Sequence, residues 1–188
     1  MRFGTALLRA IVGGLFVGHG LQKLAGWFDG GGLSATGEMF ESMGLAPGKV
    51  HAGAAGAAEA GGGALLAAGL ATPFAASLLS GTMITAIRKV HFKNGPWTTK
   101  GGYEYNLVLI AAVFAIADTG PGKLSADEAL GIRRSGLGWA LAQLAAGAVG
   151  SLAAVELGQR AAASATPTPQ AAQEPQPSNG TAEAALAD

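Results

Sequence analysis

The residues of this chain that could do chemistry are few, and the most unusual is Glu59. It lies in the middle of a stretch of alanine and glycine from about residue 50 to residue 70. An ionisable side chain in the apolar part of a bilayer costs about 3 kcal/mol on insertion scales and is a functional candidate by default. Its partner would be a cation on a neighbouring helix, either Lys23, Arg88 or Arg9. Alternatively, a protonated Glu59 would only tie two helices together.

A second group of polar and aromatic residues surrounds a connection rich in glycine at residues 91–102. It contains His91, Trp97, Tyr103, Glu104 and Asn106. Two interpretations remain open for this group: its aromatic rings form an interfacial belt, or they line a pocket together with its polar side chains. In the same way, Lys23 is either an interfacial anchor or a member of that pocket.

The elements that position these residues are apolar segments close to the roughly 20 residues that a membrane-spanning helix needs. They cover about residues 5–24, 50–70, 72–90 and 103–117, and a fifth covers 137–157. We therefore predict an all-α fold, a transmembrane four-helix bundle with a fifth helix that spans the membrane or lies on it. The predicted divisions are a four-helix domain over 1–130, the fifth helix within 131–160, and a disordered tail over 161–188 that holds four of the eight prolines.

Four crossings bring the end of the first helix, both ends of the connection at 91–102 and the start of the second helix to one face of the membrane. This face collects Lys23, Arg88, His91, Trp97 and Glu104. The link around residues 70–73 is so short that the second and third helices must form an antiparallel hairpin. The polar cluster is therefore expected above Glu59, whichever way the protein inserts.

Composition supports the membrane and excludes several kinds of chemistry. Of the 188 residues, 49% are hydrophobic and only 13% are charged, about half the share of a soluble domain. Twelve basic and twelve acidic residues cancel, which argues against a nucleic-acid partner. The chain has no cysteine, so disulfides and thiolate metal sites are excluded. The three histidines lack the spacing of metal ligands, and we expect no metal.

Small residues predict how the helices meet. Gly14 and Gly18 are four residues apart on the first helix, and Gly53, Ala57 and Gly61 have the same spacing on the second. Faces of this kind let helix backbones approach closely in lipid, where no hydrophobic force drives helices together. We therefore expect these small-residue faces to be surfaces at which the helices pack.

Several motifs occur together in this chain: Arg9 with Gly14, Gly18 and Lys23; Gly56-x-x-Glu59-x-x-Gly62 with Gly69-Leu70-x-Thr72; Asn94-Gly95-Pro96-Trp97; Gly101-Gly102-Tyr103-Glu104-Tyr105-Asn106; and Gly120-Pro121-Gly122-Lys123-Leu124-Ser125. Together they resemble the motifs of the DoxX family of small bacterial and archaeal membrane proteins. The resemblance covers about residues 5–130. It implies a four-helix membrane protein, and some relatives are subunits of quinone-linked oxidoreductases.

Two functions follow as hypotheses. In the first, the protein is a redox-linked subunit with a quinone in the polar pocket, where Glu59, Glu104 and Lys23 form a proton relay or ion pair. Trp97, Tyr103, His91 and Asn106 would then hold the quinone. In the second, it is a noncatalytic platform that recruits a redox or envelope enzyme. Both place the chain in the plasma (inner) membrane as a multi-pass protein, with a redox protein or a second copy as partner. A small transporter is disfavoured because no inverted repeat is visible.

Overall fold

All regular structure in the described part of the chain, residues 3–165 of a computed structural model, is helical, as predicted. The five long helices are α1 (Phe3–Leu24), α3 (Gly48–Ala68), α4 (Thr72–Ala86), α5 (Glu104–Thr119) and α7 (Leu137–Ser164), and the two short ones are α2 (Gly32–Ser42) and α6 (Ala126–Ala129). α7 continues through residues 161–164, which we had assigned to the tail, because alanine favours helix. The rest of the predicted tail, from residue 166, lies outside the described residues.

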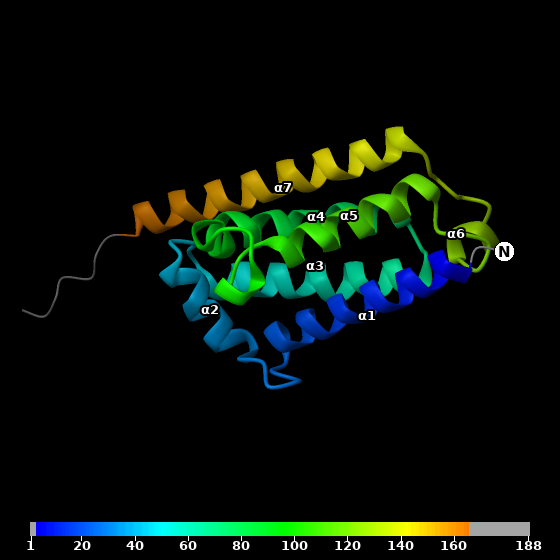
Figure 1. The fold of residues 1–188 in the computed structure, drawn as a ribbon. Helices are drawn as coiled ribbons and strands as arrows, with labels where there is room; N and C mark the ends of the chain where they lie inside the picture. The colour runs from blue at the N-terminus through cyan, green and yellow to red at the C-terminus, as the bar shows by residue number, and fades with distance from the viewer. Residues whose placement is uncertain (1–2, 166–188) are drawn as a thin grey trace, which may run out of the picture.

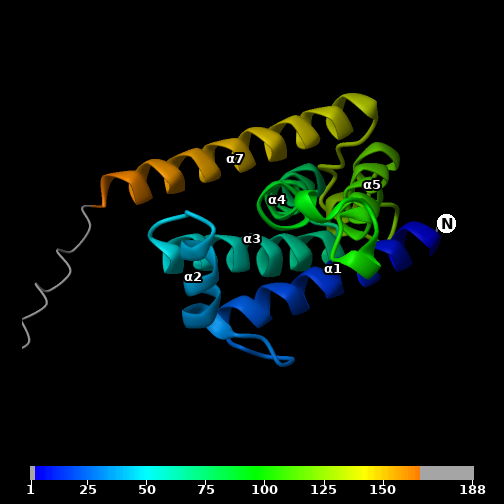
Figure 2. The same ribbon diagram turned by 60° about the vertical axis from the view of Figure 1, so that its left-hand side comes forward.

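The five long helices run alternately up and down and form one bundle (Figure 1). α1 packs on α3, while α4 lies between α3, α5 and α7. Figure 2 shows α2 running across one end of α3 and the start of α7 lying above α5 in this view. We call the end with residues 25–47 and 87–103 the loop end, and the end with residues 69–72 and 120–136 the α6 end.

Beyond Ala86 the chain of α4 continues as a wider helical turn and then as a tighter one. A π-helical turn, η1 (Ile87–His91), is followed by two 3₁₀ turns, η2 (Phe92–Asn94) and η3 (Thr98–Lys100). α4 and η1 together cover the predicted third span. The following connection is held by backbone hydrogen bonds from Tyr103 to Gly95 (3.2 Å) and from Glu104 to Pro96 (2.8 Å). This glycine-rich segment is thus a folded cap on the loop end.

α1 and α3 approach closely through glycine. A methyl group on Gly13 would lie 2.5 Å from the carbonyl oxygen of Gly63, and one on Gly63 would lie 2.6 Å from that of Gly13. Two helical turns further along α1, a methyl group on Gly20 would lie 2.6 Å from the carbonyl oxygen of Gly56. Any side chain at these positions would separate the two backbones.

The helix faces that we predicted for packing are therefore corrected. A side chain at Gly14, Gly18 or Gly61 would meet nothing within 4 Å, and one at Gly53 would meet only the side chain of Leu33. Gly14 and Gly18 share their face of α1 with Leu7, which is 61% exposed. Gly13 and Gly20 lie on the opposite face, where the buried residues of α1 lie. Small residues do bring α1 and α3 together, but they are Gly13 and Gly20 and not Gly14 and Gly18.

Contact between α4 and α7 combines close backbones with polar pairs. A methyl group on Gly81 would lie 3.0 Å from the carbonyl oxygen of Gly147. On either side of this contact, Ser80 Oγ donates to Gln143 Oε1 (3.0 Å) and Thr85 Oγ1 donates to Ser151 Oγ (2.8 Å). The fifth helix is thus an integral wall of the bundle.

The outer faces of the bundle are apolar. Large hydrophobic side chains that are more than half exposed occur on all five long helices: Phe3, Leu7, Ile11, Val50, Phe74, Val108, Leu137, Leu141, Val149, Leu152 and Leu157. Within residues 3–165, α1 and α7 are long and apolar enough to cross a membrane, with mean hydropathies of 1.3 and 1.5. α4 and α5 have only 15 and 16 residues. Outer faces with this many exposed apolar side chains are typical of a protein surface that contacts lipid.

Candidate functional site

A cavity of about 690 Å³ opens at the loop end, within the roughly 300–1,000 Å³ of small-molecule sites. α1, α2, α3, α4, η1, α5 and α7 all contribute to its walls, which are mostly apolar, with methionine, leucine, alanine and phenylalanine side chains. The side chains that can ionise or donate hydrogen bonds are His19, Lys23, His51, Glu59, Ser77, Thr82, Thr85, Lys89, His91, Thr98, Tyr105, Asn106 and Ser151. The cavity therefore suits a ligand with a large apolar part and a few polar atoms.

An ion pair between Lys23 and Glu59 lies on the wall of this cavity. Lys23 Nζ is 2.6 Å from Glu59 Oε2, and the two side chains are 23% and 5% exposed. The close contact of Gly20 with α3 brings the last turn of α1 to the middle of α3, so the lysine reaches the glutamate. The pair thus places one positive and one negative charge in an apolar wall, and each compensates the other.

The other candidate partners of Glu59 lie elsewhere. The Nη2 atom of Arg9 donates to the carbonyl oxygen of Leu124 at the α6 end. Arg88 Nη1 reaches the carbonyl oxygen of Ser151 on α7 at 3.5 Å. Both therefore support helix packing instead of the cavity.

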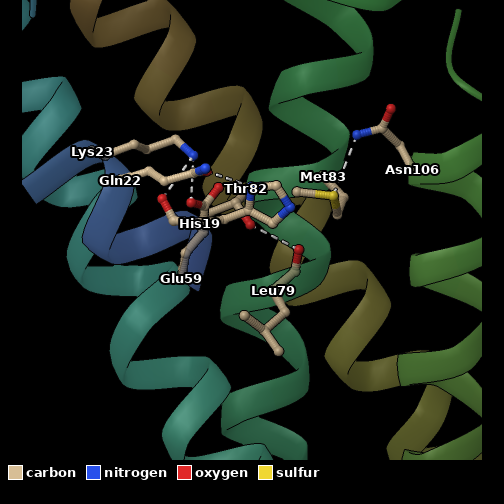
Figure 3. A network of polar contacts seen from close by, with 8 residues as sticks. All are labelled: His19, Gln22, Lys23, Glu59, Leu79, Thr82, Met83 and Asn106. Atoms are coloured by element: carbon tan, nitrogen blue, oxygen red, sulfur yellow. Dashed lines mark hydrogen bonds and ion pairs between the residues drawn. The ribbon is translucent and has the colours of Figure 1, made fainter. Parts of the chain in front are cut away.

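A histidine and a glutamine adjoin the ion pair on α1. His19 Nδ1 lies 3.1 Å from Gln22 Oε1, and Gln22 Nε2 donates to the carbonyl oxygen of Phe28 (3.2 Å). Lys23 Nζ is also 3.4 Å from the carbonyl oxygen of His19. Figure 3 shows these side chains together with Glu59 between α1 and α3. The polar part of the cavity wall is thus a connected cluster, which we call the His19–Glu59 cluster (His19, Gln22, Lys23 and Glu59).

Asn106 brings an amide to the cavity from α5. Only 6% exposed, it donates from Nδ2 to the thioether of Met83 at 3.3 Å (Figure 3). A thioether is a weak acceptor, so this donor is poorly satisfied by the protein. The amide is available to a stronger acceptor such as a carbonyl oxygen.

His91 also lines the cavity, but with one nitrogen engaged. Its Nδ1 is 2.7 Å from the carbonyl oxygen of Gly101, which joins the π-helical turn to the folded connection. The third histidine, His51, lies on the same cavity and its ring stacks on Phe40, with ring centroids 6.4 Å apart. All three histidines of the chain thus lie on this cavity. In residues 3–165 no three His, Asp or Glu side chains converge as metal ligands.

Glu104, Trp97 and Tyr103 do not line the cavity, although we expected them in the site. A Glu104 oxygen accepts a hydrogen bond from the backbone N–H of Thr98 (2.7 Å), outside the apolar part of α5. This hydrogen bond holds the pKa of Glu104 below its usual range. Glu104 is therefore a cap on the connection and is separate from Glu59.

The two aromatic rings lie on the outside of the loop end. Tyr103 stacks on Phe92 with ring centroids 6.1 Å apart, and Trp97 is 61% exposed. The backbone bonds that fold the connection direct both rings outward. Their position suits the interfacial belt that remained open as the alternative.

Sequence reasoning passed over His19, although a signal was present. Residues four apart share a helix face, so His19 must accompany Lys23 on α1. Asp127 was also missed. It is 1% exposed and accepts hydrogen bonds from the backbone N–H groups of Ala71 (2.7 Å) and Thr72 (2.9 Å) and from the Thr72 hydroxyl (2.7 Å). No local pattern links residues more than 50 positions apart.

Comparison with known proteins adds a family. The family model described as DoxX matches residues 4–92, which include Lys23 and Glu59. The chain is 36% identical over 113 residues to a protein of Bacillus subtilis (strain 168) named "Putative oxidoreductase CatD". The aligned part is 60% of this chain and 78% of that relative. No solved structure matches the chain.

Proposed function

The chain belongs to the DoxX family of membrane proteins, and we propose that it serves as a quinone-binding, multi-pass subunit of an oxidoreductase in the plasma membrane. The observation that carries this proposal is the cavity of about 690 Å³ with apolar walls and the Lys23–Glu59 pair on one side. The name of the Bacillus relative supports a redox role in general terms.

The residues present fit the chemistry of a quinone. A quinone has an apolar ring and tail and two carbonyl oxygens that accept hydrogen bonds. Asn106 Nδ2, held only by a thioether, is a suitable donor for one oxygen. Lys23 Nζ can turn a proton toward the other while it stays paired with Glu59. The apolar residues of α2 and α7 would surround the tail.

The quinone supplies two-electron, two-proton chemistry, and the protein supplies positioning and charge. The chain has no cysteine for a thiol couple or a cysteine-ligated iron–sulfur cluster, and the proposal assigns the supply of electrons to a partner redox protein. The pairing of Glu59 with Lys23 keeps an acid and a base beside the cavity, where they can hold a proton for a ring oxygen.

Multi-pass insertion is part of this proposal and is supported by the alternating helix directions and the apolar outer faces. α1 and α7 meet the length and hydropathy of single spans. α3 and α4 lie between them in the bundle, with α4 parallel and α3 antiparallel to α1 and α7. The bundle can therefore cross the bilayer only as a unit.

Binding of a short-chain ubiquinone to the purified protein in lipid nanodiscs tests the proposal. A side chain at Gly150 meets no atom within 4 Å and this glycine lines the cavity, so Gly150→Leu fills the space without a clash. We expect this variant to lower the affinity at least tenfold. Gly138→Leu is the matched control, since it lies on the same helix, is equally open and is away from the cavity.

Saturable binding that Gly150→Leu weakens and Gly138→Leu leaves unchanged supports the proposal. Absence of saturable binding by the unaltered protein overturns it and favours the noncatalytic platform. Equal effects of the two variants would show that ubiquinone partitions into the lipid and not into the cavity.

A further inference from the structure

The hydrogen bonds around His19 fix which of its two nitrogens carries the proton in the neutral ring. The carbonyl oxygen of Phe28 can only accept, so the amide nitrogen of Gln22 must face it. The amide oxygen of Gln22 therefore faces His19, and an amide oxygen also only accepts. Nδ1 of His19 must then be the donor. In the neutral imidazole this leaves Nε2 with a free lone pair.

Nε2 of His19 is the atom that remains for a ligand. The His19 side chain lines the cavity, and no group among residues 3–165 makes a hydrogen bond to Nε2. In Figure 3 the ring extends from α1 toward the α4 residues Thr82 and Met83, across the space beside the ion pair. Gln22 is itself anchored at Phe28, so the ring is held in one orientation.

We infer that His19, through Nε2, is the residue that exchanges a proton with a ring oxygen of the bound quinone; this rests on the proposed function. A quinone that takes two electrons from a partner reductase would also take two protons, one on each oxygen, the first from His19 and the second from water. Protonated His19 gives up its Nε2 proton as one O–H bond forms, and it returns to the neutral Nδ1–H form. In the reverse direction Nε2 accepts a proton from a quinol hydroxyl.

The chemistry suits an imidazole more than the groups beside it. Imidazole is the side chain that exchanges a proton near neutral pH. Glu59 is paired with Lys23. If either side chain gave up or took up a proton, the other would be left as an unpaired charge in an apolar wall. The other groups that face the cavity and can ionise are His51 from α3, Lys89 and His91 from η1, and Tyr105 from α5. His91 Nδ1 and His51 Nε2 also face carbonyl oxygens, those of Gly101 and Ala46. His19 differs from both because its ring lies beside the Lys23–Glu59 pair (Figure 3).

The first test reads the tautomer by ¹⁵N NMR of the protein in nanodiscs, with the His19 signals identified by their loss in His19→Gln. At alkaline pH we expect a protonated Nδ1 and a bare Nε2. In Gln22→Leu, which removes the acceptor of Nδ1, we expect a mixture of both tautomers. A proton on Nε2 in the unaltered protein at alkaline pH would overturn the inference.

The second test measures the affinity for a short-chain ubiquinone and for its quinol, kept reduced under argon, as a function of pH. Protonated His19 donates to a quinone oxygen, so quinone binds more tightly on the acid side. Neutral His19 accepts from a quinol hydroxyl, so quinol binds more tightly on the alkaline side. We expect the quinone affinity to change about tenfold across the transition, the value of one hydrogen bond from a charged group, and the quinol affinity to change in the opposite direction by a smaller factor, because neutral His19 makes that bond.

His19→Gln is expected to abolish both pH dependences, while His51→Gln and His91→Gln, matched controls on the same cavity, keep them. Equal quinone binding at all pH values by the unaltered protein overturns the role of His19 and leaves the proposed function standing. Absence of quinone binding by the unaltered protein overturns both. A pH dependence that survives His19→Gln assigns the proton exchange to another group and also overturns the inference.

Discussion

Glu59 and Lys23 differ in how much they depend on one another. Glu59 is almost fully buried, while nearly a quarter of the Lys23 side chain is exposed. Without Glu59, the lysine can turn its ammonium toward water. Without Lys23, the carboxylate stays in an apolar wall with no route to water. The acid therefore depends on the base more than the base depends on the acid.

This asymmetry predicts a double-mutant cycle with unequal sides. We expect Lys23→Gln to lower the free energy of unfolding by about 3 kcal/mol and Glu59→Gln by about 1 kcal/mol, because only the first leaves a buried unpaired charge. The double variant should be more stable than Lys23→Gln alone. Denaturant unfolding in detergent measures all four proteins. Additive losses would mean that the two side chains do not interact.

Glu59→Gln also separates a chemical role from a structural one. The amide keeps the size and hydrogen-bonding capacity of the side chain but cannot hold a charge or exchange a proton. We expect the bundle to fold and quinone-linked turnover with the partner protein to fall at least tenfold. Glu59→Leu is the companion variant. If the leucine variant unfolds while the glutamine variant keeps full turnover, Glu59 only joins helices.

Asp127 is the second buried acid, and its role belongs to the α6 end. Its carboxylate caps the start of α4 through two backbone N–H groups and one hydroxyl, and its own N–H donates to the carbonyl oxygen of Gly69 (2.8 Å). We expect Asp127→Asn to cost about 2–3 kcal/mol of unfolding free energy, since an amide offers one acceptor atom in place of two. Glu128→Gln should cost less than about 1 kcal/mol, because the ion pair of Glu128 with Arg133 (3.4 Å) is exposed to solvent. Equal losses would contradict the capping role.

At the scale of the helices, the sequence was sufficient for their existence but not for their rotation. Five apolar segments of the right length become five long helices. The choice between the two glycine stripes of α1 needed one further argument. Arg9, Gly13, Phe16 and Gly20 share one face, while Leu7, Ile11, Gly14 and Gly18 share the opposite one. A charged residue in a membrane helix faces the protein, so Arg9 identifies the buried face.

The candidate site shows the same division. Helix parity alone places Lys23, His91 and Asn106 at the same end as the mouth of the cavity. It cannot choose Lys23 over Arg88 as the partner of Glu59, because that choice depends on helix rotation and on the depth to which α1 reaches. It also cannot predict that Trp97 and Tyr103 turn outward, since backbone bonds across residues 95–104 decide this.

Alanine substitutions on the two stripes of α1 are expected to have opposite signs. Gly20→Ala places a methyl group against the backbone of α3 and should destabilise the protein by about 1–3 kcal/mol. Gly18→Ala meets no neighbour and should stabilise it by up to about 1 kcal/mol through the lower entropy of alanine in a helix. Thermal unfolding in detergent compares them. Destabilisation by Gly18→Ala alone would place the contact on the face that we had first expected.

The whole molecule separates its polar chemistry from its anchoring. The cavity and its ionisable groups lie at the loop end, whereas Arg9 and Asp127 close the α6 end. The three tryptophans are 41–61% exposed: Trp27 and Trp97 lie at the loop end and Trp139 lies at the start of α7, near the α6 end. In the proposed multi-pass arrangement, the exposed tryptophans at the two ends of the apolar bundle would lie at the two membrane interfaces.

This arrangement predicts a topology that cysteine labelling can read, because the chain has no cysteine of its own. Asp29→Cys and Lys100→Cys, both at the loop end, should react with a membrane-impermeant maleimide from one side of sealed vesicles. Lys123→Cys and Arg133→Cys, both at the α6 end, should react from the other. Arg160→Cys near the end of α7 should react with the loop-end pair, because α7 runs in the direction of α1. Labelling of Arg160→Cys together with Arg133→Cys would mean that α7 lies on the membrane without crossing it, and labelling of Asp29→Cys and Lys100→Cys from opposite sides would refute the bundle topology.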